Sequence, residues 1–273
     1  MNKIYQVYQV SDSTGETLDR IFLAIKAQFS NFDCKTIHYS FTRTKNQIDK
    51  IISNFRTEKN IIILYTIVDN DLAKYLVTET KKNNIPCFEV LGDLIVSFSK
   101  LLKQEASRKP SGQHVLDEEY YKRIEAVQFT ITHDDGKVIS DLDNSDVILV
   151  GVSRTSKTPT SIYLANRGYK VANIPFIPNK NIPSQLIESS KKTCVIGLIC
   201  DETRLLDVRR NRIQSMHKDR LGDYTNKKEI LHEIENSKKI FKKYNWPVLD
   251  VTRKSVEETA ASIIKILDIL DSK

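Results

Sequence analysis

The sequence predicts an α/β protein in which a Rossmann-like βαβ domain precedes a second domain with its own parallel sheet. Strand-like and helix-like segments alternate along the first hundred residues, which is the pattern of repeated βαβ units. A further apolar run, Val147–Gly151, ends in a polar loop that leads into a helical pattern. Between them, residues 103–117 contain Pro110 and Gly112, which interrupt regular structure. We therefore expect domains at 1–105 and 106–273.

In the first domain, apolar residues predict strands and helices in turn. The expected strands are Ile4–Val10, Thr36–Phe41, Ile61–Val68 and Pro86–Leu91. Helices are expected between them because apolar residues recur there at helical spacing: Leu18, Ile21, Phe22 and Ile25, then Ile48, Ile51, Ile52 and Phe55, then from Leu72 to Val77.

A polar turn, Ser11–Thr17, follows the first strand of this domain. It lies at the carboxyl edge of the predicted sheet, where ligands of open α/β sheets bind, so it could be an anion or substrate loop. It could equally be a helix N-cap, with Ser13 or Thr14 capping and Glu16 in the first turn. The residues do not decide between the two.

The second domain is expected to begin with a helix from Asp117 to about Val127. The Asp135-Gly136 pair lies between two short alternating runs, 129–132 and 137–139, which predicts a β-hairpin. Further strands are expected at Tyr169–Ile174, Thr193–Cys200 and Trp246–Val251. The last helix starts at Ser255, where Glu258 completes a capping box.

The most informative motif of the chain follows the strand Val147–Gly151. It matches the phosphate-binding loop G-x-x-x-x-G-K-[S/T] except that a serine replaces the second glycine, and it reads Gly151-Val152-Ser153-Arg154-Thr155-Ser156-Lys157-Thr158. The strand fixes the loop, the backbone N–H groups converge on an anion, and the helix N-terminus favours negative charge. The motif predicts a P-loop kinase-like parallel-sheet domain, with Lys157 and Arg154 neutralising phosphate and Thr158 offering a hydroxyl to Mg²⁺.

Three other residues are candidates for the chemistry. Asp135 could act as general base on an incoming hydroxyl, or serve turn geometry only. His114, in the interdomain segment, could be catalytic or simply solvated. Asp201 ends the apolar run Thr193–Cys200 and could hold magnesium, or cap the helix that follows it.

An arginine-rich helical segment comes after Asp201. Its basic residues are Arg204, Arg209, Arg210, Arg212, Lys218 and Arg220. The segment could be a solvated helix face, with Leu205, Val208, Ile213 and Met216 on its apolar side. Forked guanidinium groups also bind phosphate or an acidic partner surface, and the density of arginines favours that role.

Composition narrows the function classes. The net charge of +7 suits an enzyme that handles phosphate, and without a basic tail it does not favour nucleic acid. The four cysteines have no C-x-x-C spacing, which favours buried thiols of a reducing compartment. No leader pattern and no apolar run near 18 residues is seen, so we expect a cytoplasmic protein without membrane contact. The oligomeric state stays open, a homodimer included.

The sequence resembles the pyruvate, phosphate dikinase regulatory proteins, relatives of the phosphoenolpyruvate synthase regulatory proteins. The resemblance is carried by Gly151–Ser161 with Gly168–Pro175, and by Ser11–Thr17, His133–Gly136, Pro247–Thr252 and Glu257–Ala260, in the same order as in that family. Two residues depart from the expected pattern: Ser156 replaces the loop glycine, and Thr132 stands where several members have lysine.

The resemblance implies a bifunctional serine/threonine kinase and phosphorylase. It would phosphorylate a threonine of the dikinase with ADP as donor, and remove that phosphate with inorganic phosphate, giving pyrophosphate. Gly151–Thr158 would hold the nucleotide phosphates and Asp135 would be the base. The synthase is the alternative protein substrate. The residues alone also allow an ATP-dependent small-molecule kinase or a non-catalytic nucleotide sensor.

Overall fold

The computed structural model describes residues 3–56, 59–112, 116–177, 180–215 and 223–272. Contacts divide the chain into two compact units, Met1–Val115 and Leu116–Lys273. Each unit contains a four-stranded, all-parallel sheet with helices on its faces, so the predicted α/β class with two α/β parts is confirmed. No helix among these described residues is long and apolar enough to cross a membrane.

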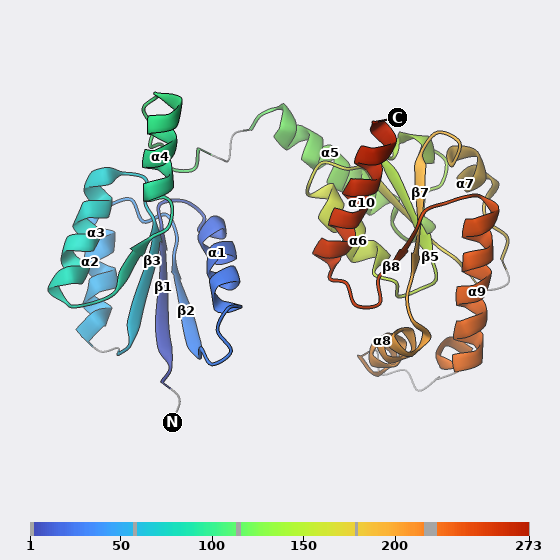
Figure 1. Ribbon diagram of the computed structural model, residues 1–273, viewed down its shortest axis with the longest axis horizontal. Coiled ribbons are helices and arrows are strands. Elements are labelled where there is room, and N and C mark those ends of the chain that lie inside the picture. Colours follow the sequence, from blue (N-terminus) through green and yellow to red (C-terminus); the bar gives the residue numbers. More distant parts are fainter. Residues whose placement is uncertain (1–2, 57–58, 113–115, 178–179, 216–222, 273) are drawn as a thin grey trace. The chain divides into compact units, whose positions relative to one another are not determined.

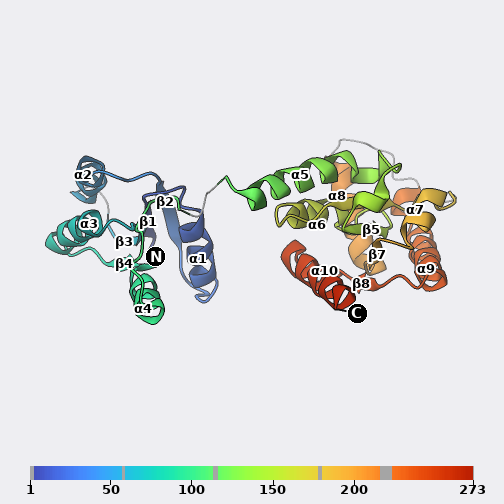
Figure 2. The same ribbon diagram turned by 90° about the horizontal axis from the view of Figure 1, so that it is seen from above.

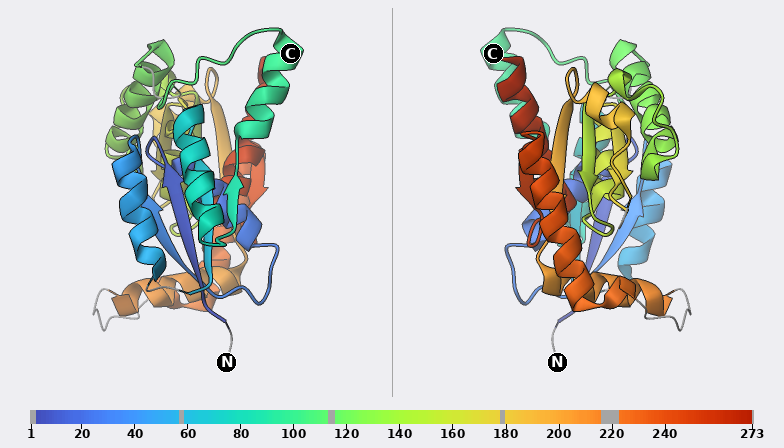
Figure 3. Two further views of the ribbon diagram at one scale, coloured as in Figure 1. Left: turned by 90° about the vertical axis from the view of Figure 1, so that its left-hand side faces the viewer. Right: turned by 90° about the vertical axis from the view of Figure 1, so that its right-hand side faces the viewer.

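The first unit has the strand order β2-β1-β3-β4 (Figures 1 and 3). Its elements in chain order are β1 (Tyr5–Ser11), α1 (Glu16–Lys26), β2 (Cys34–Tyr39), α2 (Lys45–Ser53), a 3-10 turn (Asn54–Arg56), β3 (Ile61–Thr66), α3 (Asn70–Lys82), β4 (Cys87–Glu89) and α4 (Gly92–Leu102). Helices α2 and α3 cover one face, where Tyr8, Ile63 and Leu76 are fully buried, and α1 covers the other (Figure 2).

The second unit has the strand order β6-β5-β7-β8. Its elements are α5 (Glu118–Thr132), 3-10 turns at Asp134–Gly136 and Leu142–Asn144, β5 (Val147–Gly151), α6 (Lys157–Ala165), β6 (Val171–Pro175), α7 (Ser184–Ser189), β7 (Cys194–Ile199), α8 (Glu202–Ser215), a 3-10 turn (Asp223–Thr225), α9 (Lys227–Lys243), β8 (Val248–Asp250) and α10 (Val256–Asp271). Helices α6 and α10 pack on one face and α7 and α9 on the other (Figures 1 and 2).

Strand β5 lies in the interior of the second sheet, because β6 pairs with one of its edges and β7 with the other. All five of its residues are buried, which explains its unbroken apolar composition. After β5 the chain runs to β6 on one side of the sheet, whereas after β7 it runs to β8 on the other side, so the connections from these two neighbouring strands go in opposite directions. The loop after β5 therefore lies at the topological switch point, where open α/β sheets place their ligands.

The predicted hairpin around Asp135 is wrong. Residues 129–132 continue α5, because Ala126, Thr130 and His133 recur at helical spacing and are all buried. Asp135 and Gly136 do form a turn, with φ values of 55° and 67°. These left-handed residues end the helix in a 3-10 turn, and no strand follows them before β5.

Two further expectations need adjustment. The second strand begins and ends two residues earlier than predicted, because Phe41 has φ 54° and cannot continue an extended chain. Helices α4, α7 and α9 were not expected. In α4, most of the apolar side chains are exposed: Leu94, Val96, Phe98, Leu101 and Leu102.

Candidate active site

The loop between β5 and α6 is shaped by residues in the left-handed region. Gly151 has φ 142°, and a Cβ atom there would collide with the carbonyl oxygen of Leu198 on β7. Only glycine fits, because the collision is with backbone that cannot move aside. Arg154 and Ser156 also have positive φ, 75° and 58°. The loop therefore turns tightly and delivers the chain into α6 at Lys157.

The N-terminus of α6 faces this loop without a side-chain cap from Ser156. The first amide groups of a helix have no partner within the helix, and together with its dipole they favour an anion. Because Pro159 is the third residue of α6 and carries no N–H, the first turn begins with the amides of Lys157 and Thr158. Thr155 braces the loop from inside, where its hydroxyl donates to the Val152 carbonyl at 3.0 Å.

Lys157 is buried inside the loop. Its Nζ atom donates to the carbonyl oxygens of Gly151 (3.0 Å) and Val152 (2.8 Å). Burial lowers the pKa of Lys157 to about 8, and the nearby carboxylate of Asp135 opposes that shift. Arg209 and Arg154 add to the lowering, so several cations converge on this loop. Such a cluster in a buried loop is suited to a multiply charged anion.

The lowered pKa predicts a pH dependence of anion binding. Lys157 loses its proton as the pH rises through about 8, whereas an unfolded lysine keeps its proton to 10.5. Folding therefore favours the neutral form of Lys157 between these values. An anion binds the charged form. We therefore expect the Kd for pyrophosphate to increase by up to ~10-fold per pH unit above the folded pKa, with proton uptake on binding. Calorimetry in buffers of different ionisation enthalpy tests this, and binding without proton uptake at pH 8.5 would contradict it.

Thr158 belongs to a polar network with Asp134 and Asn173. The Thr158 hydroxyl donates to Asp134 Oδ1 at 2.9 Å. The Asn173 amide donates to the same carboxylate oxygen at 2.6 Å and to Thr158 Oγ1 at 3.0 Å. Asn173 comes from the middle of β6 and is 1% exposed, and its amide oxygen has no partner among the described residues. Asn173 was not expected as a site residue, although its position as a polar residue inside an apolar strand could have indicated one.

The two aspartates of the turn after α5 have different surroundings. Asp134 is half-buried and held by Thr158 and Asn173. Asp135 is exposed, yet it lies close enough to Lys157 to act on that lysine's pKa. The turn itself is fixed by His133, whose ring nitrogens contact the Phe129 carbonyl and Asp141 Oδ1, each at 2.8 Å. The structure thus brings Asp135 to the phosphate loop.

Arg209 anchors the other side of the loop. This fully buried guanidinium bonds to both carboxylate oxygens of Glu233 on α9, at 3.2 and 2.6 Å, and to the Ser153 carbonyl at 3.3 Å. It also stacks on the ring of Tyr224, whose hydroxyl lies 3.3 Å from both Ser153 Oγ and Arg154 Nε. The arginine-rich helix therefore supplies a buried support for the loop. Met216, Lys218 and Arg220 lie outside the described residues.

Breaking the Arg209–Glu233 pair should destabilise the second unit. We expect Glu233→Gln and Arg209→Met each to lower the free energy of unfolding by about 3–5 kcal/mol, because one partner would stay buried without its counter-charge. Urea unfolding followed by circular dichroism measures the change. The exposed pair of Lys192 and Asp143 is the control, and Lys192→Ala should leave the transition midpoint nearly unchanged. Equal effects of the buried and exposed variants would contradict the role given to Arg209.

Asp201 caps α8. Its Oδ1 accepts from the backbone N–H groups of Thr203 (2.9 Å) and Arg204 (3.2 Å), and these bonds hold its pKa below the usual value. Among the residues the structure describes, no three His, Cys, Asp or Glu side chains converge as metal ligands.

His114 lies outside the described residues, so its suggested catalytic role stays a prediction.

The Ser11–Thr17 turn of the first unit has its own small cavity. Gly15, with φ 88°, is the N-cap of α1, so the predicted capping by Ser13 or Thr14 is wrong. The cavity of about 90 Å³ is lined by Ser11, Ser13 and Ser111 among others. Arg43 donates to Ser111 Oγ at 3.1 Å and to the Asp12 carbonyl at 2.8 Å, and burial raises the pKa of Asp12. These polar groups satisfy one another within the cluster.

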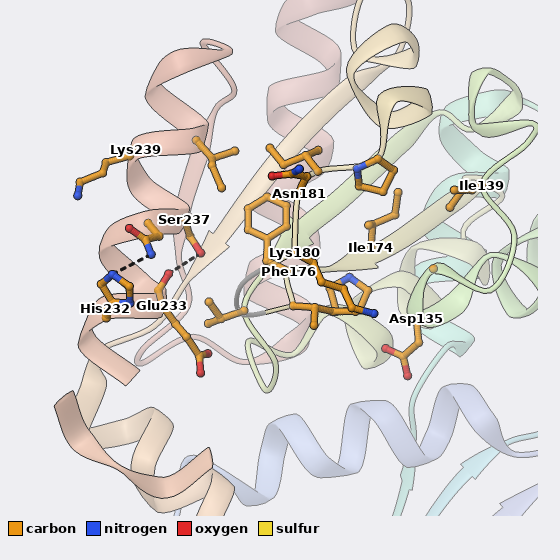
Figure 4. A pocket seen from close by; sticks show the side chains of 18 of the residues that line it. Asp135, Ile139, Ile174, Phe176, Lys180, Asn181, His232, Glu233, Ser237 and Lys239 are labelled. Carbon is orange, nitrogen blue, oxygen red and sulfur yellow. Dashed lines mark hydrogen bonds between the residues drawn. The ribbon is translucent and has the colours of Figure 1, made fainter. Parts of the chain in front are cut away.

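A larger cavity, of about 600 Å³, opens beside the phosphate loop in the second unit (Figure 4). Asp135 and Ile139 lie along one of its sides, and α9 contributes His232, Glu233 and Ser237 from the other. The end of β6 and the chain after it provide Ile174, Phe176 and Lys180. Its size is that of a small-molecule or peptide site.

A parallel α/β unit whose switch-point loop gathers a lysine, a threonine and two aspartates defines a class of phosphate-handling proteins. The family model described as "Kinase/pyrophosphorylase" matches residues 7–264, and the chain belongs to this family of phosphotransferases.

Individual relatives agree along nearly the whole length. A protein of Pelagibacter ubique (strain HTCC1062), named "Putative pyruvate, phosphate dikinase regulatory protein", is 58% identical over 98% of both chains. Proteins with the same name from Bradyrhizobium diazoefficiens (41% identical, covering 97% of this chain and 95% of the relative) and Bartonella tribocorum (42%, covering 97% and 96%) are also similar. The resemblance to the dikinase regulatory proteins is therefore confirmed.

Proposed function

We propose that this chain regulates a pyruvate, phosphate dikinase by phosphorylating one of its threonines with ADP and by removing that phosphate with inorganic phosphate. The observation that supports the proposal most is the convergence of Lys157, Thr158 and Asp135 on one loop, in a chain whose relatives carry the dikinase regulator name. The backbone of Gly151–Thr158 holds the phosphates. Lys157 and Arg154 neutralise their charge, which is the main demand of phosphoryl transfer.

In the forward direction the threonine hydroxyl attacks the terminal phosphorus of ADP. The new bond joins threonine Oγ to that phosphorus, the bond to the bridging oxygen breaks, and AMP leaves. Asp135 accepts the hydroxyl proton, because its carboxylate is exposed beside the loop and lines the neighbouring cavity. Asp134 is less suited as base, since Thr158 and Asn173 already donate to it.

In the other direction inorganic phosphate takes the place of the leaving nucleotide. One of its oxygens attacks the phosphorus of phosphothreonine, the bond to threonine Oγ breaks, and pyrophosphate forms. Asp135 transfers a proton from the incoming phosphate to the threonine oxygen as the bond between that oxygen and phosphorus breaks. Both directions move a phosphoryl group between a threonine oxygen and a phosphate oxygen, so one loop can serve both.

A magnesium ion fits this site. The Thr158 hydroxyl and the Asp134 carboxylate lie 2.9 Å apart at the start of α6, and hard oxygen donors of this kind are what magnesium prefers. When bound, the ion would neutralise phosphate charge in the transition state. Asp201 fits less well, because its Oδ1 is committed to the amides of α8.

The proposal is tested by incubating the purified chain with β-labelled ADP and a purified dikinase. Label is expected on one threonine of the dikinase, and inorganic phosphate should then release it as labelled pyrophosphate. A parallel reaction with phosphoenolpyruvate synthase distinguishes the two protein substrates, and one with ATP distinguishes the donors. Absence of transfer to both proteins would overturn the proposed function.

A further inference from the structure

The 600 Å³ cavity lies next to Asp135, the proposed base for the hydroxyl group that accepts the phosphate. Asp135 and Gly136 from the turn after α5 line it, and so does Val152 from the phosphate loop. Figure 4 shows the Asp135 carboxylate at one end of the cavity and the α9 side chains at the other. A group that fills the cavity must therefore extend away from Asp135, toward α9.

Apolar and polar side chains both line the cavity. Its apolar part comes from Ile139, Ile174, Phe176, Ile177, Ile182 and Ile240. Lys180, Lys239 and His232 lie among the polar lining residues together with Glu229, and Glu233 is engaged by Arg209. Charges of both signs are mixed and favour neither an anion nor a cation, so the six apolar residues are the part of the wall that can select a ligand by burial.

We infer that this cavity binds the segment of the substrate protein that carries the threonine, with a large apolar side chain next to that threonine filling it. The inference rests on the proposed function and adds to it the place and the chemistry of acceptor recognition. The hydroxyl must come within hydrogen-bond reach of its base. A segment of the substrate protein can meet this requirement while it occupies the cavity. Its threonine hydroxyl then reaches Asp135, and the neighbouring apolar side chain enters the cavity.

The nucleoside of ADP is the competing occupant, and electrostatics disfavours it. A nucleoside in the cavity would draw its own phosphates past the carboxylate of Asp135, and like charges repel. A hydroxyl, in contrast, donates to that carboxylate. The cavity therefore suits the acceptor, while the phosphates lie over the loop between β5 and α6.

Two variants change the cavity without touching the loop. Ser237 is buried on α9 and lines the cavity, and its hydroxyl donates to the Glu233 carbonyl four residues earlier, so Ser237→Leu narrows the cavity. Ile177 is 51% exposed, so Ile177→Gln removes apolar surface with little risk to folding. The controls lie on α10. The half-buried Ser262 donates in the same way to the Glu258 carbonyl, and Ile269 is also 51% exposed, which gives Ser262→Leu and Ile269→Gln.

The experiment measures three quantities for each variant: the KM for the dikinase at saturating ADP, the KM for the phosphorylated dikinase at saturating phosphate, and the Kd for ADP by calorimetry. We expect the cavity variants to raise both protein KM values at least tenfold and to keep the Kd for ADP within twofold. The α10 variants should match the wild type in all three.

Each other outcome overturns the inference. A weakened Kd for ADP with unchanged protein KM values would assign the cavity to the nucleoside. Unchanged values throughout would show that neither ligand enters it. Failure of the proposed function looks different, because the wild-type chain itself would then transfer no label from ADP to the dikinase.

Discussion

Lys157→Ala is expected to reduce both directions of phosphoryl transfer by at least about a hundredfold, since removing one preorganised electrostatic contact costs about 10²–10³ in rate. The effect should be large because Nζ lies inside the loop, 3.0 and 2.8 Å from two of its carbonyl oxygens. Initial rates with labelled ADP, and with phosphate and phosphorylated dikinase, measure the two directions.

The pair of rates also tests the single-site mechanism. Lys170→Ala is a suitable control, because this lysine pairs with Glu125 on α5 and not with the loop. If Lys157→Ala lost phosphorylation but kept full phosphate-dependent dephosphorylation, two sites would be needed and the shared loop would be disproved.

Asp135→Asn should lower kcat in both directions by roughly 10²–10⁴, the usual contribution of a general base or acid. The asparagine keeps the size of the side chain and the left-handed backbone, which asparagine tolerates. Nucleotide binding should persist, because the carboxylate of Asp135 repels the negative phosphates and therefore does not contribute to their binding. Stopped-time assays at saturating substrates, together with calorimetry for ADP, separate kcat from affinity.

Two further variants sharpen the assignment of the base. Asp134→Asn should instead disturb the position of Thr158, because it replaces the carboxylate that Thr158 and Asn173 share. Its effect should depend on magnesium concentration. Asp143→Asn, an exposed aspartate paired with Lys192, should be indistinguishable from the wild type. A normal kcat for Asp135→Asn would show that Asp135 is not the base and would make Asp134 the candidate.

The sequence was sufficient for features that depend on local pattern. The βαβ alternation, the buried strand β5 and the start of α6 all follow from periodicity and from the glycine and lysine of one motif. The Asp-Gly pair correctly indicated a turn, which Asp135 and Gly136 form with positive φ values. It did not reveal what the turn connects, because a left-handed residue can end a helix as readily as it joins two strands.

Features that depend on long-range contact could not be predicted. Arg209 pairs with Glu233, which lies on another helix, and no spacing in the sequence reports that contact. Similarly, the cavity is assembled from the ends of α5 and β6 and from one face of α9, a helix the pattern did not show. Asn173 is an intermediate case, since its polarity within β6 was visible but its partners were not.

Pro159, the third residue of α6, has a consequence for how tightly this enzyme can hold its ligands. A proline there removes one of the backbone donors with which a helix start usually holds phosphate. More of the anion's charge must then be met by side chains, one of which releases its proton near pH 8. On the proposed function, such a site would bind AMP, pyrophosphate and phosphate less tightly than a site built from amides alone. Weaker binding would let products leave in either direction, which the proposed reversible reaction requires.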